Sequence, residues 1–243
     1  MSISKEELEH TAQTYHRQDV LDDKHIEGAC QAYTFEWVFG HIMPDDLVLE
    51  MGYGDGLFTE ALHARHHEFE VVEGAASLVA TISAKYPGVR AWHALFEEFA
   101  PEQKYDVVLC THVLEHIIDP VALLRRMQGW LKPGGKLIII VPNRDSLHRR
   151  LAVLMGLQPA RDSLGARDRL VGHVRVYNFA SLISDAESAG YAVLDQTGFF
   201  LKVLPNSMML TYSEDLISAF NRISPDLPPE LLANIGIVAG VRA

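Results

Sequence analysis

The sequence predicts an α/β fold built on a mainly parallel sheet. From residue 47 onward, short apolar runs alternate with stretches of helical periodicity. Strands that alternate with helices favour parallel pairing, because each helix returns the chain to the same end of the sheet. The first apolar run ends in a glycine-rich turn that opens a helix, as at the ligand-binding end of such sheets. The 243 residues are 48% apolar and 22% charged, which is typical of a globular protein of one or two domains.

Five strands are expected in the first part of the sheet. Each is short, apolar and bounded by glycine, proline or a helical stretch. The expected strands cover residues 47–51, 69–73, 89–93, 105–110 and 136–141, and helices cover residues 57–65, 75–85 and 120–131. Residues 132–135, Lys-Pro-Gly-Gly, are expected to form the loop that ends the third of these helices.

Both ends of the chain depart from this alternation. Residues 1–42 predict two helices, with Ser4 and Glu7 in a capping-box pattern, and are interpreted as an N-terminal helical cover. The domain proper is then residues 43–243. Within it, residues 144–178 lack strands and are expected to form a cap over the substrate. The remaining expected elements are an amphipathic stretch over 147–157, an arginine-rich loop, helices over 179–190 and 216–223, and strands over 191–196, 199–204 and 235–242.

Charge and cysteine content limit the classes of partner. There are 21 Lys and Arg against 32 Asp and Glu, a net charge of -11, which repels phosphate backbones, so no nucleic-acid partner is expected. Cys30 and Cys110 show no metal or disulfide spacing, and Cys110 lies in an apolar run typical of a buried thiol. Without a signal peptide or an apolar run near the ~20 residues that span a bilayer, we expect a cytoplasmic protein without a membrane partner.

The glycine turn discriminates between two kinds of nucleotide ligand. A dinucleotide site requires Gly-x-Gly-x-x-Gly/Ala, but the pattern that starts at Gly52 reaches Leu57 at its third position. Glu50, just before the glycines, would repel a pyrophosphate and suits an ammonium or sulfonium group. Glu73, 17 residues after Gly56, closes the second strand, where a carboxylate can accept hydrogen bonds from two ribose hydroxyls.

These residues belong to a longer series of motifs. The series is VLEMGYGDG, Glu73, YDVVLCTHVLEHIIDP, LKPGGKLIIIVPN and GHVRVYN, in that order. In it the chain resembles the class I S-adenosylmethionine-dependent methyltransferases, and most of all their small-molecule members, such as the O-methyltransferases of ubiquinone, sugar and natural-product pathways. The resemblance implies a Rossmann-like sheet of seven strands with helices on both faces, an antiparallel last strand, and S-adenosylmethionine across the carboxyl ends of the strands.

The resemblance also assigns cofactor contacts. It places the methionine part of S-adenosylmethionine near the glycine turn and the end of the fourth strand, and the ribose at the end of the second. After the third strand this chain has Ala-Leu-Phe-Glu in place of the family's frequent adenine-binding Asp, so the adenine is expected to rest on an apolar wall. The cofactor-binding residues implied are Glu50, Gly52, Gly54, Gly56, Glu73, Leu95, Phe96, Thr111 and His112.

The acceptor chemistry predicts a second group of residues. A hydroxyl acceptor needs a base near its proton, whereas an amine needs only its lone pair and correct placement. His116 and His173 are the expected catalytic residues, and Tyr15, Arg175 and Tyr177 the expected substrate contacts. His112 and His116 are four residues apart and would share a face if a helix began there. With Glu115 they carry three potential metal ligands, but without a further acidic cluster no metal is expected.

The expected cap is basic. Residues 144–176 hold seven arginines and three aspartates, a local charge of +4 in a chain of -11. This favours an anionic substrate, contacted by Arg149, Arg161, Arg169 or Arg175. The alternative is that these arginines pair with acids of the main domain or face water.

We therefore expect a methyltransferase that acts on a small molecule, with a hydroxyl oxygen as the preferred acceptor. The alternatives are a small-molecule N-methyltransferase and a non-catalytic S-adenosylmethionine-binding protein. A nicotinamide-dependent oxidoreductase is disfavoured by Glu50 and by the missing third glycine. A base-modifying methyltransferase is disfavoured because Thr-His-Val-Leu stands where Asn/Asp-Pro-Pro-Tyr/Phe is expected. The apolar residues of the cap and of residues 199–204 suit either the substrate or a homodimer interface.

Overall fold

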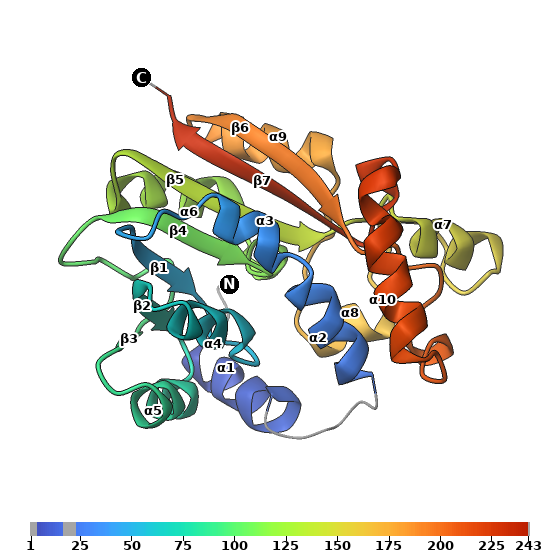
Figure 1. The fold of residues 1–243 in the computed structure, drawn as a ribbon, viewed down its shortest axis with the longest axis horizontal. Coiled ribbons are helices and arrows are strands. Elements are labelled where there is room, and N and C mark those ends of the chain that lie inside the picture. The colour runs from blue at the N-terminus through green and yellow to red at the C-terminus, as the bar shows by residue number, and fades with distance from the viewer. Residues whose placement is uncertain (1–3, 17–22, 243) are drawn as a thin grey trace.

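The computed structural model describes residues 4–16 and 23–242, except for the side chains of residues 15, 16 and 166. In this part of the chain, seven strands form one sheet in the order β3-β2-β1-β4-β5-β7-β6 (Figure 1). Only β7 is antiparallel to its neighbours, β5 and β6. This confirms the predicted Rossmann-like sheet. The strands are β1 (Leu47–Met51), β2 (Glu68–Glu73), β3 (Arg90–His93), β4 (Tyr105–Thr111), β5 (Leu131–Pro142), β6 (Tyr191–Phe199) and β7 (Asn234–Val241).

Helices follow the expected order. Ser4 and Glu7 form the predicted capping box at the start of the first helix. The helices are α1 (Lys5–Thr11), the π-helix η1 (Ala12–His16), α2 (Lys24–Ala32), α3 (Phe35–Gly40), α4 (Leu57–Ala64), α5 (Ala76–Lys85), α6 (Pro120–Met127), α7 (Leu147–Leu154), α8 (Ala166–Leu170), α9 (Phe179–Ser188) and α10 (Glu214–Ile223). Single 3-10 turns are η2 (Leu114–His116), η3 (Gln128–Trp130), η4 (Asn206–Met208), η5 (Ser224–Asp226) and η6 (Pro229–Leu231).

Apolar side chains form a buried core on each face of the sheet. On one face α6 and α9 pack on β4, β5 and β7, with Leu124 and Leu182 fully buried. On the other face α3, α4 and α5 pack on β1 and β2, with Leu62 and Ile82 fully buried. A third cluster joins α2 to α10. Burying a side chain of this size contributes about 1.5–3 kcal/mol, so the two large cores hold the strand ends in fixed positions.

Strand β5 starts five residues earlier than predicted. Its pairing with β4 shifts register between the pair Tyr105–Leu131 and the pair Val107–Lys136, which marks a bulge. Gly135 lies in this bulge, where an added Cβ would be 3.0 Å from the Lys132 carbonyl oxygen. Residues 132–135 therefore form a bulge within β5 in place of the expected loop, because the glycines allow this irregular stretch between two paired segments of the strand.

The predicted strand over residues 199–204 is also wrong. β6 is a single strand that ends at Phe199, and Phe200 has a left-handed φ of 63°. This conformation turns the chain out of the sheet and toward α10 (Figure 1). In the N-terminal region, the structure has α1, α2, α3 and a π-helical turn where two helices were predicted. The amphipathic stretch begins as α7, and the arginine-rich loop contains α8.

A buried carboxylate between β2 and β4 gives a testable stability prediction. Glu70 is 7% exposed and accepts hydrogen bonds from Trp92 Nε1, Gln103 Nε2 and the Tyr105 hydroxyl at 2.6–2.7 Å. Glu70→Ala leaves these donors without their acceptor, which we expect to cost about 3 kcal/mol and to lower Tm by roughly 6–12 °C in thermal unfolding. Glu102→Ala, which breaks only the exposed pair with Arg90, is the control and should shift Tm little. Equal shifts in the two variants would contradict the prediction.

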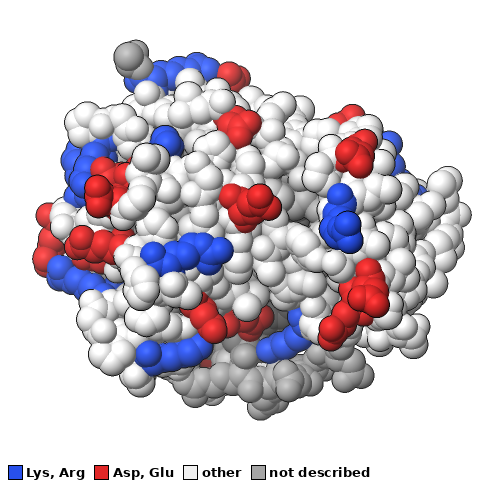
Figure 2. Space-filling view, in the orientation of Figure 1, with Lys and Arg blue, Asp and Glu red and all other residues white. Residues whose placement is uncertain are grey.

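The surface carries both signs of charge. Figure 2 shows basic and acidic side chains interspersed on this face, with wide uncharged areas between them. Among the described residues, no helix combines the length and apolarity needed to cross a membrane.

Candidate functional site

A cavity of about 750 Å³ opens at the carboxyl ends of β1 and β4. Its lining comes from the glycine turn, the end of β4, helix α2, the segment after β5 and residues 202–207. Figure 1 shows α2, α7, α8 and α10 gathered at this end of the sheet. A narrow slot of about 50 Å³ adjoins it and shares Leu8, Gly74, Phe96 and His116 with its wall.

The glycine turn exposes backbone to the cavity. Gly52, Gly54 and Gly56 all have positive φ values, between 53° and 79°. Gly52 and Gly54 line the cavity, but Gly56 does not. A Cβ at Gly56 would lie 2.5 Å from the ring of Tyr53. The predicted ligand contact at Gly56 is therefore corrected: this glycine lets the chain enter α4 beneath the Tyr53 ring.

Glu73 is held in place by the backbone at the end of β2. One carboxylate oxygen accepts the Tyr53 N–H at 2.9 Å and the other accepts the Ala75 N–H at 2.7 Å. The residue is 6% exposed and lines the cavity. A carboxylate oxygen can accept more than one hydrogen bond, so each retains capacity for a ligand hydroxyl. The geometry suits a vicinal diol such as a ribose.

Glu50 places a second carboxyl beneath the glycine turn. It is 2% exposed and accepts a 2.6 Å hydrogen bond from the Thr59 hydroxyl. Burial raises the pKa of Glu50 to about 8, and the nearby charge of Glu73 acts in the same direction. A buried carboxyl of this kind gains its charge readily only beside a cation. Glu50 therefore fits the cationic end of an amino acid or sulfonium ligand.

The slot has the apolar walls expected for an adenine ring. Leu95 and Phe96, both predicted, line it together with Leu8 from α1 and Gly74 after β2. A Cβ at Gly74 would lie 2.3 Å from a Leu8 methyl group, so glycine allows α1 to pack against this wall. The contribution of Leu8 is not apparent from sequence, because α1 lies far from β3 along the chain.

Thr111 and His112 line the cavity at the end of β4, as predicted. His112 has a left-handed φ of 55°, and the following helical turn covers only Leu114–His116. The expectation that His112 and His116 share a helix face is therefore wrong. Instead His112 Nδ1 lies 3.4 Å from Glu115 Oε1. Burial lowers the pKa of His112, but the Glu115 carboxylate outweighs it and the pKa lies above its usual value.

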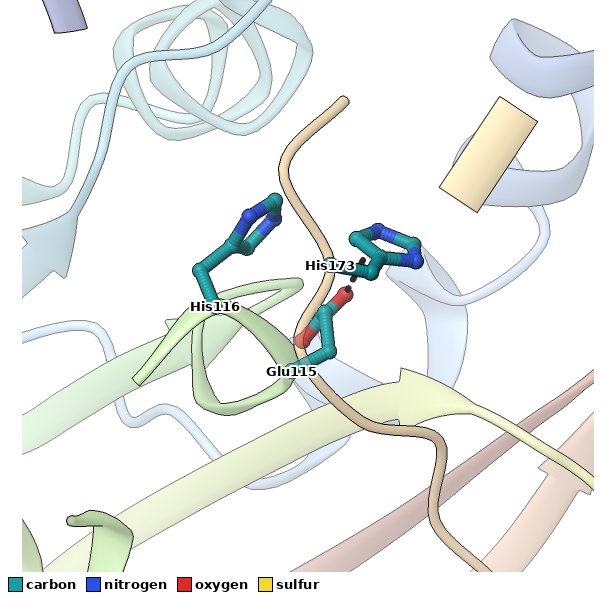
Figure 3. A group of neighbouring side chains, drawn as sticks. All are labelled: Glu115, His116 and His173. Atoms are coloured by element: carbon teal, nitrogen blue, oxygen red, sulfur yellow. Dashed lines mark ion pairs between the residues drawn. The ribbon is translucent and has the colours of Figure 1, made fainter. Parts of the chain in front are cut away.

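Both predicted catalytic histidines line the cavity and lie together (Figure 3). The rings of His116 and His173 are 4.8 Å apart and nearly perpendicular. Figure 3 shows Glu115 and His116 on the turn after β4, and His173 on the cap segment that crosses it. Burial lowers the pKa of His116, and the Glu115 carboxylate opposes this only in part. His116 is thus neutral near pH 7 and can accept a proton.

Glu115 is fully buried beside these rings. Its Oε1 lies 3.9 Å from His173 Nε2, and neither of its oxygens has a hydrogen-bond partner among the described residues. Burial raises the pKa of Glu115, but the surrounding imidazoles outweigh it and hold the carboxylate ionised. Potential metal-ligand atoms of Glu115, His116 and His173 lie within 4.8 Å of one another. This group contains His173 in the place that His112 held in the group considered from the sequence.

Asp168 fixes the orientation of His173, and sequence analysis missed it. Its carboxylate contacts His173 Nδ1 at 3.1 Å and accepts two hydrogen bonds from one Arg149 nitrogen at 2.8 and 3.0 Å. Burial raises the pKa of Asp168, but the bonds from His173 and Arg149 dominate and bring it well below its usual value. The ionised carboxylate therefore fixes the orientation of the His173 ring and leaves Nε2 toward Glu115.

Three of the seven arginines of the basic cap form ion pairs within the part of the chain that the structure describes. Arg149 pairs with Asp168, Arg161 with Asp145, and Arg167 with Asp23. For these three arginines the structure shows the alternative of pairing with acids, and two of the acids, Asp145 and Asp168, belong to the cap itself.

Two of the three predicted substrate contacts, Arg175 and Tyr177, do not line the cavity. Arg175 donates to the Ile118 carbonyl, and the Tyr177 hydroxyl donates to Asp185. Both side chains are engaged in these contacts, and neither lines the cavity. Tyr15 was predicted on the cover, and its side chain lies outside the described residues.

The known proteins that this chain resembles are methyltransferases. A family model described as a methyltransferase domain matches residues 28–196. A ubiquinone biosynthesis O-methyltransferase of Aeromonas salmonicida is 29% identical over 187 residues, which cover 74% of this chain and 76% of that protein. The protein of the same name from Xanthomonas euvesicatoria is 34% identical over 113 residues, which cover 44% of this chain and 47% of that protein.

Solved structures share the fold. The CcbJ methyltransferase of Streptomyces caelestis has a TM-score of 0.63 at 18% identity, with 97% of this chain and 98% of that chain covered. A SAM-dependent methyltransferase of Thermotoga maritima has a TM-score of 0.64 at 18% identity, with the same coverage.

Proposed function

The chain belongs to the methyltransferase domain family and is an S-adenosylmethionine-dependent methyltransferase, and from this premise we propose that it methylates a hydroxyl oxygen of a small molecule. The observation that carries the proposal is the half-buried His116 on the cavity wall, whose lowered pKa keeps it neutral beside the ionised Glu115. A hydroxyl group requires such a proton acceptor, whereas an amine acceptor does not. Membership of the family alone does not distinguish the two.

The residues around the glycine turn fit S-adenosylmethionine. Glu73 would receive the ribose hydroxyls, the slot at Leu95 and Phe96 would take the adenine, and Glu50 would face the positive charge of the methionine part. When bound, S-adenosylmethionine supplies a methyl group that its sulfonium charge already activates. The protein then has to place the acceptor oxygen in line with that methyl group and to exclude water.

We assign His116 as the base that takes the proton of the acceptor hydroxyl. The imidazole takes it as the oxygen becomes the nucleophile, and the buried Glu115 carboxylate stabilises the imidazolium that results. Asp168 orients the His173 ring through Nδ1, so that Nε2 is presented to the same space. It therefore orients the acceptor or receives the proton in turn. Residues 1–42 act as the cover of this site, and the segment over about 144–178 as the substrate cap.

Product analysis tests the acceptor atom. The protein is incubated with S-adenosylmethionine labelled with ¹³C in the methyl group, and with pairs of phenols and anilines of matched shape. NMR distinguishes a methoxy carbon from an N-methyl carbon. We expect methoxy products from the phenols, with rates unchanged by a metal chelator. Methylation confined to the anilines would contradict the proposal and favour an N-methyltransferase, and no methylation of either would favour a non-catalytic S-adenosylmethionine-binding protein.

Glu50→Gln tests how the affinity for S-adenosylmethionine depends on pH. The pKa of Glu50 in the free protein is about 8, so binding of a cation must ionise it at lower pH. Affinity for S-adenosylmethionine should therefore rise by up to about tenfold per unit over roughly pH 6 to 8 and then level off. Glu50→Gln should bind more weakly and lose this dependence. Calorimetric titrations at several pH values, with the exposed Glu60→Gln as control, measure both effects.

The same substitution should stabilise the free protein. The folded-state pKa of Glu50 is raised above its unfolded value of 4.5, so the stability it contributes is present below pH 4.5 and is lost as pH rises toward 8. At neutral pH, the raised pKa of Glu50 lowers the free energy of unfolding by about 3 kcal/mol. A tenfold change in a protonation equilibrium corresponds to about 1.36 kcal/mol. Glu50→Gln avoids this cost and should raise Tm increasingly from acidic to neutral pH. A pH-independent Tm difference would contradict the role given to Glu50.

A further inference from the structure

Lys202 places a largely, but not fully, buried positive charge at the side of the cavity formed by α2 and the segment after β6. Its side chain is 12% exposed and lines the cavity. The carboxylate paired with it is Glu27, whose Oε1 lies 3.7 Å from Lys202 Nζ, beyond hydrogen-bond distance. An ammonium group has three N–H donors, and none forms a hydrogen bond within the described residues. A buried cation in this state is well placed to receive an oxygen ligand.

Glu27 is shared between Lys202 and two other donors. It accepts a hydrogen bond from Asn206 Nδ2, and Arg167 Nη2 lies 3.7 Å from the same oxygen that faces Lys202. Arg167 is drawn toward Asp23, with which it forms a closer ion pair. One carboxylate oxygen therefore faces two cations and an amide donor, and the ammonium of Lys202 is the group without a hydrogen bond.

His148, on α7, adds an unpartnered donor or acceptor nearby. It lines the cavity, and its Nδ1 is buried without a hydrogen-bond partner among the described residues. Burial lowers the pKa of His148 well below its usual value, and the positive charges of Lys202 and Arg149 act in the same direction. The neutral ring can donate one hydrogen bond to an anion. Arg149 has no such role, because Asp168 and two backbone carbonyls occupy its nitrogens.

From these contacts we propose that Lys202 and His148 bind a carboxylate group of the methyl acceptor. The substrate class is then a small hydroxy acid, and its hydroxyl lies toward His116 in the same cavity. This inference rests on the proposed function and deepens it. It also moves the anion contact from the arginines of the cap to a lysine after β6, because Arg149 and Arg161 are paired with aspartates and Arg175 donates to a backbone carbonyl.

Binding measurements test the inference without turnover. The protein is saturated with S-adenosylhomocysteine and titrated with a panel of small aromatic and aliphatic hydroxy acids, each beside its methyl ester. The variants are Lys202→Met, Lys202→Arg, and Lys132→Met as a control that removes an exposed lysine paired with Asp106. For the acid that binds most tightly, we expect wild type and Lys132→Met to favour the acid over its ester by about 10- to 100-fold, the range for a hydrogen bond to a charged group.

Lys202→Met should bring this ratio close to one and leave the affinity for the ester unchanged. Lys202→Arg should restore part of the preference. The inference is overturned if no acid in the panel binds wild type better than its ester, or if Lys202→Met weakens acid and ester equally. Methylation of the same compounds is scored separately. Acids that bind through Lys202 but receive no methyl group would contradict the proposed function and leave this subsite in place.

Discussion

Glu73→Ala is expected to weaken the binding of S-adenosylhomocysteine by about 100-fold or more. Glu73 is buried at the end of β2, and both its oxygens are already aligned by backbone N–H groups. The two ribose hydroxyls would each donate a charge-assisted hydrogen bond, worth about 1.5–3 kcal/mol apiece. Because the carboxylate is held in place before binding, little of this energy is lost to ordering it. Isothermal titration calorimetry measures the change directly.

Two further variants distinguish a loss of ribose contacts from a loss of folding. Glu68→Ala removes an exposed carboxylate from the other end of the same strand and should bind like wild type. Glu73→Gln keeps an acceptor for one backbone N–H and should bind with intermediate affinity. If folded Glu73→Ala retains wild-type affinity, the ribose is held elsewhere.

His116→Gln should reduce kcat by about 100-fold, within the range that a general base contributes. The side chain keeps some of its volume and polarity but cannot accept the proton. Affinity for S-adenosylhomocysteine should not change, because Glu50, Glu73 and the glycine turn are untouched. His63→Gln, on the polar end of α4, is the matched control. A fall in kcat shared by both variants, or an effect on KM alone, would contradict the role of His116.

Most of the fold follows from local sequence pattern. β1 runs from residue 47 to 51 as predicted, because a short apolar run followed by glycine has few other solutions in an α/β chain. The errors at residues 132–135 and 199–204 have a different origin. The bulge in β5 depends on its register with β4, and the end of β6 depends on the left-handed φ of Phe200. Both are set by tertiary packing and not by composition.

The residues of the site also divide into those that the sequence pattern predicts and those that depend on tertiary packing. Glu50 and Glu73 could be predicted because they sit at the carboxyl ends of recognisable strands. Asp168 could not, because it lies in a segment without strand periodicity. Lys202 could not, because residues 199–204 were expected to form a strand, and Lys202 reaches the cavity only because the chain leaves the sheet at Phe200. Counting charges predicted a basic cap, but the count does not reveal that Arg149 forms an ion pair with Asp168. A residue's type gives its chemistry, and only its partners decide whether that chemistry is available.

The dependence of kcat on pH, measured at saturating cofactor in wild type and His116→Gln, tests the central claim most directly. The lowered pKa of His116 predicts that wild-type kcat rises with pH along a limb below about 6.5 and is flat above it, since only the neutral imidazole accepts the proton. His116→Gln should be slow and should lack this limb. A wild-type profile that is retained unchanged in the variant would contradict the claim that His116 takes the proton of the acceptor hydroxyl.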